Sequence, residues 1–102
     1  MILFSLHFAM AKEMPVEPNE GLRSEVVELI GPMYFGDYED QGFTVEVLFT
    51  VNSNRELILL YVDAENESVR SYFKRKLNYK NVDHQASKPG EIFLLPVTVL
   101  VP

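Results

Sequence analysis

Residues 43–51, Phe-Thr-Val-Glu-Val-Leu-Phe-Thr-Val, alternate bulky apolar side chains with mostly polar ones. This period of two is typical of a β-strand that has one buried face and one face in solvent. The following Asn52-Ser53-Asn54 predicts a turn, and residues 57–62 predict a returning strand. Strict alternation in that second strand would divide it into two apolar sets, Ile58, Leu60 and Val62 against Leu57, Leu59 and Tyr61.

One amphipathic helix is predicted on each side of this hairpin. The first has Asn19 as its N-cap and ends at Gly31-Pro32, with Leu22, Val26, Leu29 and Ile30 at helical spacing between them. The second runs from about Asn66, its N-cap, to Leu77. Its apolar stripe consists of Val69, Tyr72, Phe73 and Leu77.

A last strand is predicted over residues 92–101, and it contains Pro96. Proline cannot donate a ladder hydrogen bond, so this strand belongs at the edge of the sheet. We therefore expect residues 19–102 to form a single α+β domain with the element order α-β-β-α-β. The three strands form an antiparallel sheet in the order 2-1-3, and both helices pack on one face of it.

The composition limits the classes of function. A chain of 102 residues with 47% hydrophobic residues supports one small globular domain. A formal net charge of −6 argues against general nucleic-acid binding, which requires a basic surface. The absence of cysteine excludes disulfides and thiolate metal sites.

The first residues resemble an export signal. Met1 to Ala11 form an apolar run that ends in Ala-Met-Ala, the small-x-small form of a signal-peptidase site. We expect residues 1–11 to be a truncated signal-peptide remnant; the alternative is an ordinary N-terminal strand or helix. The run is too short to span a bilayer, which takes roughly 20 apolar residues. Residues 12–18 are polar, contain two prolines and are expected to be a linker. A periplasmic or secreted location follows if the signal is real, and a cytoplasmic one if it is not.

The chain resembles the C-terminal domain of TonB-type energy transducers over roughly residues 20–101. The resemblance is carried by Phe49-Thr50-Val51-Asn52 before the turn, by the position of the 66–77 helix, and by Leu95-Pro96-Val97-Thr98-Val99 at the end. More narrowly, residues 62–67 and 76–80 are similar to small exported proteins of Bacteroidetes with no assigned function. The resemblance implies a periplasmic interaction module whose closing edge strand accepts an extended segment of a partner.

The expected function is therefore non-enzymatic protein–protein interaction through the C-terminal edge strand, with an unknown partner protein or a second copy of the chain. Surplus apolar residues on the outer side of the sheet, Leu48, Leu94 and Leu100, support this hypothesis. The candidate partner-binding residues are Leu95, Val97 and Val99.

Chemistry of other kinds has little support in the sequence. No catalytic, cofactor-binding or metal-binding motif is present, and His84 is expected to be a surface residue without a role. The acidic residues Asp37, Glu39 and Asp40 form either a solvated loop or a weak cation site. The alternative function is binding of an anionic ligand or nucleic acid through the basic cluster of the second helix, Arg70, Lys74 and Arg75.

Overall fold

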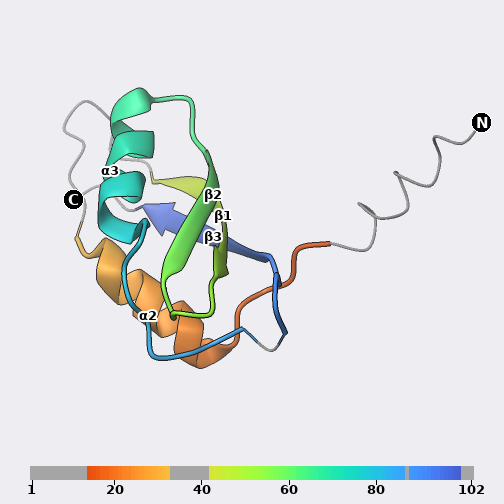
Figure 1. The fold of residues 1–102 in the computed structure, drawn as a ribbon. Helices are drawn as coiled ribbons and strands as arrows, with labels where there is room; N and C mark the ends of the chain where they lie inside the picture. The colour runs from red at the N-terminus through yellow and green to blue at the C-terminus, as the bar shows by residue number, and fades with distance from the viewer. Residues whose placement is uncertain (1–13, 33–41, 87, 100–102) are drawn as a thin grey trace, which may run out of the picture.

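The computed structural model describes residues 14–32, 42–86 and 88–99. Its elements are, in order, α2 (Glu20–Ile30), β1 (Phe43–Val51), β2 (Leu57–Asp63), α3 (Glu67–Leu77) and β3 (Phe93–Val99). The strands form one antiparallel sheet in the order β2-β1-β3. Both helices lie on the same side of that sheet (Figure 1). The predicted fold class, strand order and placement of the helices are confirmed.

Both helices begin where the sequence places their caps. The Asn19 side chain accepts a hydrogen bond from Leu22 N at 2.8 Å, and the Asn66 side chain accepts from Ser68 N and Val69 N. These bonds satisfy backbone donors that a helix leaves unpaired in its first turn. Gly31, with φ of 67°, ends α2, because glycine enters this left-handed conformation without a steric penalty.

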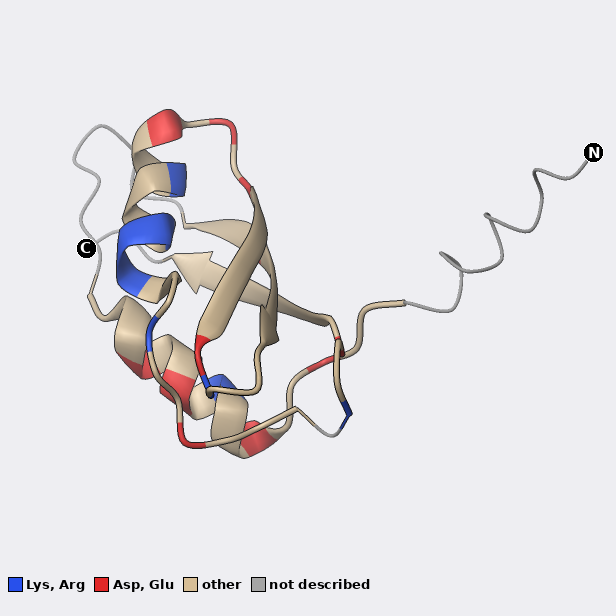
Figure 2. Cartoon of the chain, in the orientation of Figure 1, with Lys and Arg blue, Asp and Glu red and all other residues tan. Residues whose placement is uncertain are grey.

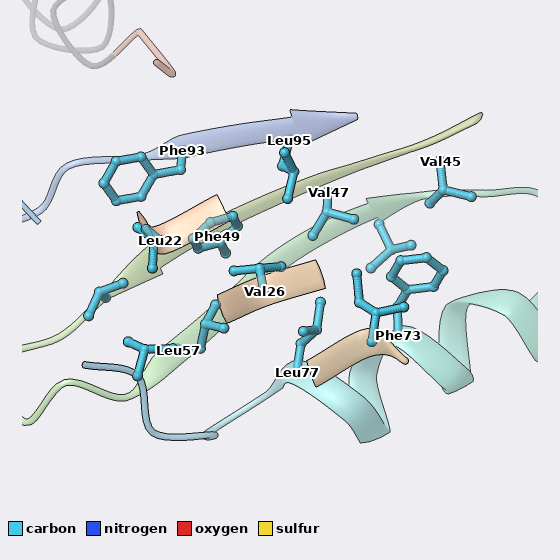
Figure 3. Packing of buried hydrophobic residues seen from close by; sticks show 14 of the residues in the cluster. Leu22, Val26, Val45, Val47, Phe49, Leu57, Phe73, Leu77, Phe93 and Leu95 are labelled. Carbon is cyan, nitrogen blue, oxygen red and sulfur yellow. The ribbon is translucent and has the colours of Figure 1, made fainter. Parts of the chain in front are cut away.

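The core lies between the helices and one face of β1. Val45, Val47, Phe49 and Val51 are buried, while Thr44 and Glu46 on the opposite face are exposed. Figure 3 shows Val26, Phe73 and Leu77 of the helices pointing into the same layer as Val47 and Phe49. The buried set also includes Leu22, Ile30, Leu57, Val62, Val69, Val82, Phe93, Leu95 and Val99.

The second strand departs from strict alternation. Phe49 pairs with Leu59 and Leu48 pairs with Tyr61, so Leu60 is an extra residue at a β-bulge. Before the bulge the odd-numbered Leu57 faces the core, and after it the even-numbered Val62 does. The predicted separation of Ile58, Leu60 and Val62 from Leu57, Leu59 and Tyr61 is therefore wrong. The strand is apolar throughout, so its sequence alone did not fix which residues face inward.

The β1–β2 turn is built around Asn52. Its side-chain oxygen accepts from Asn54 N and Glu56 N, both at 2.9 Å, and its carbonyl accepts from Arg55 N at 3.0 Å. Arg55 closes this turn with a φ of 61°, in the left-handed region that glycine or asparagine usually occupies. The predicted turn forms without an Asn-Gly pair because the Asn52 side chain supplies bonds to the backbone.

Three segments that carry sequence predictions lie outside the described residues. They are the expected signal remnant (residues 1–11), the acidic loop with Asp37, Glu39 and Asp40, and residues 100–101 of the predicted last strand. Part of the expected linker is described, and it lies against the domain. Val16 forms a parallel bridge with Phe93 of β3, and Pro18 is buried. No helix among the described residues is long and apolar enough to cross a membrane.

Candidate interaction surface

The side chains of β3 divide between the core and the solvent. Leu95 and Val99 are each only 2% exposed, and Val97 is half-buried against the core. Figure 3 shows Phe93 and Leu95 pointing from the strand toward the helices. The two candidate partner-binding side chains Leu95 and Val99 are thus core residues, and a partner cannot contact them without opening the domain. The exposed side chains of this strand are those of Pro96 and Thr98.

The backbone N–H and C=O groups of β3 also alternate along the strand, between the side of β1 and the free edge. In an antiparallel ladder the N–H and C=O groups of one residue point to one neighbour, and those of the next residue point to the other side. Leu94 donates its N–H to Val16 O, on the side away from β1, at 2.9 Å. The backbone groups of Leu94, Pro96 and Thr98 therefore face the free edge, while those of Leu95, Val97 and Val99 face β1.

Within the described part of the chain, the free edge of β3 is covered at its beginning and open over its second half. Val16 pairs with the backbone of Ile92 and Leu94 at the beginning of the strand. Beyond that point, no described residue bonds to the outward carbonyls of Leu94 and Pro96 or to the outward N–H and carbonyl of Thr98. These groups form a short row of three acceptors and one donor, because Pro96 has no N–H.

The opposite edge, on β2, is more fully covered. Leu57 donates to Lys80 O at 2.8 Å and accepts from Tyr79 N at 2.7 Å. The N–H of Leu59 is capped by the side-chain oxygen of Asn78 at 2.9 Å. The segment after α3 thus satisfies the outward groups at the beginning of β2. Among the described residues, the second halves of both edge strands have no neighbouring strand, and the row on β3 is the one that continues from the Val16 bonds.

The sheet face that carries no helix has an apolar row across all three strands. Tyr61 of β2 pairs with Leu48 of β1, which pairs in turn with Leu94 of β3. Tyr61 is 57% exposed, and its bulge neighbour Leu60 is 49% exposed. The next row, Asp63, Glu46 and Pro96, places two carboxylates beside this apolar row. The expectation of surplus apolar residues on this side is met by Leu48 and Leu94, and Leu100 lies outside the described residues.

The basic cluster of α3 does not form one surface. Figure 2 shows the basic residues of the helix together with acidic residues along α2. The Arg70 guanidinium donates to the backbone carbonyls of Ala64 and Glu65, so it serves the connection between β2 and α3. Lys74 and Arg75 are exposed, and the Arg75 guanidinium carbon lies 5.4 Å from the centre of the Tyr72 ring. Tyr72 itself is half-buried, and its hydroxyl oxygen lies 2.7 Å from Ile30 O at the end of α2.

A carboxylate–histidine contact that the sequence did not indicate joins α2 to the loop before β3. Glu25 accepts hydrogen bonds from the N–H groups of Asp83 and His84 and contacts the His84 ring nitrogen Nδ1. The His84 ring also lies over Gly21, which is one helical turn before Glu25 in α2. A Cβ atom on Gly21 would come within 2.2 Å of the ring. Partial burial opposes ionisation of Glu25, but its hydrogen bonds with His84 and Asp83 outweigh this effect and lower its pKa. Glu25 and Asp83 are 58 residues apart in the sequence, and no sequence pattern indicates that they are in contact.

A hollow of about 410 Å³ lies between the β1–β2 turn and residues 85–86 and 88–90. Of its described lining residues, only Lys88 carries a charge. Within the described ranges, no group of three or more histidine, aspartate or glutamate side chains is placed to hold a metal ion. The described lining of this hollow therefore supplies no pair of converging ionisable groups on which to base a reaction.

Comparison of the chain with protein-family models, with curated proteins and with solved structures found no match.

Proposed function

We propose that this domain is a non-enzymatic protein–protein interaction module that binds an extended segment, of a partner protein or of a second copy, along the second half of β3. The observation that carries the proposal is a row of outward backbone groups without partners among the described residues: the carbonyls of Leu94, Pro96 and Thr98 and the N–H of Thr98. Backbone hydrogen bonds along a sheet edge give affinity to an added strand, and alternate side chains give selectivity. The resemblance of residues 95–99 to the closing strand of TonB C-terminal domains agrees with this mode of binding.

Side chains on the helix-free face extend the surface. The row of Tyr61, Leu48 and Leu94 leads across the sheet to the open edge. An added strand beside β3 places every second side chain next to Leu94 and Thr98 on this face. Tyrosine and leucine at such positions supply apolar contact area, and a tyrosine hydroxyl also remains available to water or a partner. The apolar row thus favours a partner segment with apolar side chains on that side.

We also propose that the module lies outside the cytoplasm, because Met1–Ala11 is an apolar run that ends in the small-x-small form of a signal-peptidase site. The mass of the N-terminal peptide of the protein isolated from its native host tests this part. A mature chain that begins near Lys12 supports export. A chain that retains residues 1–11 contradicts it.

The decisive variant is Thr98→Pro, matched with Thr98→Val. Proline removes the single outward N–H in the open half of the edge, and it leaves the bonds between β3 and β1 in place because those involve Val97 and Val99. Valine keeps the N–H and the β-branched shape. Proline at Val97 or Val99 is unsuitable, because it would remove a bond to β1 and destabilise the domain itself.

Each variant is measured for self-association by sedimentation equilibrium and for capture of partners from the envelope fraction of the native host. We expect Thr98→Pro to weaken association about tenfold or more and Thr98→Val to leave it near the wild-type level, with both variants folded by circular dichroism. Equal association of the two folded variants, in both assays, would remove the edge of β3 from the proposal.

Anion or nucleic-acid binding by Lys74 and Arg75 is the second candidate, because these two cations are exposed on one helix. It predicts binding of inorganic phosphate or an oligonucleotide that weakens steeply with salt. Replacing both residues with glutamate should abolish such binding. The engagement of Arg70 with backbone carbonyls makes this candidate the weaker of the two.

A further inference from the structure

The segment just before α2 occupies the edge of β3 in the way that a partner strand would. Val16 donates its N–H to Ile92 O at 2.9 Å and accepts from Leu94 N at 2.9 Å, parallel to β3. This segment, residues 14–18, is called the strap below. Figure 1 shows it in red and orange beside the chain that enters β3. The chain thus carries its own occupant for part of the proposed binding edge.

The strap can make only one rung of a parallel ladder. The next rung would join Pro18 N to Leu94 O and Pro96 N to Pro18 O, and proline has no N–H to donate in either case. The chain then begins α2 after Asn19 and leaves the edge. Val16 and Met14 remain 43% and 70% exposed and only Pro18, at the end of the strap, is buried, so the part that pairs with β3 buries little apolar surface against the domain.

We infer that the strap is a displaceable occupant of the β3 edge that competes with the incoming partner strand, and this inference rests on the proposed function. A segment that runs in the direction of the strap can repeat the bonds of Val16 to Ile92 and Leu94. If its third and fifth residues have N–H groups, it also donates to Leu94 O and Pro96 O and accepts from Thr98 N. Such a segment makes more hydrogen bonds than the strap does and replaces it.

The chemistry of the partner follows from this register. It is an extended segment of at least five residues, with no proline at the first, third or fifth position of the pairing. Its second and fourth side chains lie on one side of the sheet and its odd-numbered side chains on the other. Binding of such a segment releases Val16, and any change that holds Val16 in place weakens binding.

The first test compares Val16→Pro with Val16→Ala in the full-length chain. Proline removes the bond to Ile92 O, while alanine keeps both backbone bonds and shortens only a partly exposed side chain. Hydrogen exchange of the Leu94 amide, followed by NMR, should be about tenfold faster in Val16→Pro than in Val16→Ala, with the amides of β1 unchanged. Equal exchange of the Leu94 amide in the two variants would overturn the inference.

The second test uses a second copy of the chain as the probe. We expect Val16→Pro to self-associate about tenfold more tightly than Val16→Ala, and the added change Thr98→Pro to cancel this gain. Association that falls with Thr98→Pro but is equal in the two Val16 variants would overturn the strap and leave the proposed function in place. If neither Thr98→Pro nor Val16→Pro alters association, a second copy does not bind at the β3 edge. That result would overturn both the proposed function for a second copy and the competition between the strap and that copy.

Discussion

Replacing Arg55 with glycine should stabilise this domain. Arg55 holds a φ of 61°, and a residue with a Cβ atom in this left-handed conformation costs about 1–2 kcal/mol. Glycine removes that cost but loses more backbone freedom on folding, which offsets about 0.5–1 kcal/mol. The backbone bonds of Arg55, to Asn52 O and from Val82 N, are kept. With the middle of each range, the net gain is about 0.75 kcal/mol, or roughly 3–6 °C in melting temperature for a domain of this size.

The matched control lies in the same turn. Ser53 is exposed and is not among the described residues with positive φ, so glycine there brings the entropy cost without relieving strain. Urea unfolding, followed by circular dichroism, should therefore show a higher midpoint for Arg55→Gly than for the wild type and a lower one for Ser53→Gly. If both variants lose stability by the same amount, the turn does not strain Arg55 and the reasoning is wrong.

The remaining predictions concern the core, the loop contact and a second strained residue. Phe73→Ala should cost about 3–5 kcal/mol in urea unfolding, because its fully buried ring leaves a cavity between α3 and the sheet; a loss below about 1 kcal/mol would contradict the packing. Glu25→Gln should destabilise the domain near neutral pH but not in acid. The lowered pKa of Glu25 contributes stability above its ordinary value of 4.5, and that stability disappears as the pH falls through the folded-state pKa; a difference between variant and wild type that is constant from pH 7 to pH 3 would contradict this. Tyr79→Gly should raise the melting temperature, since Tyr79 also has a positive φ, of 64°, and its side chain is exposed; an unchanged or lower temperature would show that the tyrosine side chain stabilises the turn after α3.

The two sheet edges differ in how they are protected. Exposed strand edges invite unwanted pairing, and proteins limit this with prolines, charges or covering segments. The segment after α3 covers the beginning of β2, while among the described residues β3 is covered by Val16 alone and contains the proline at position 96. Pro96 therefore has two effects: together with Pro18 it prevents a second rung of pairing with the strap, and it leaves more outward acceptors than donors along this edge.

The helices, the strands and their order could be predicted because each depends on local chemistry. Asn19 and Asn66 are N-caps that act on the residues just after them. The alternation in residues 43–51 fixes the buried face of the central strand, since adjacent side chains must point to opposite faces. Pro96 excludes β3 from the centre of the sheet.

The sequence by itself therefore determined an α+β domain with its central strand, its two amphipathic helices and an edge strand containing a proline. Only the tertiary structure decided the bulge at Leu60, the contact between Glu25 and His84, and the side of β3 that faces outward. The physical reason is that a uniformly apolar strand has no preferred register of its own, and contacts between distant segments form only when packing brings them together. Leu95 and Val99 thus belong to the core, and the backbone groups of Leu94, Pro96 and Thr98 face away from β1.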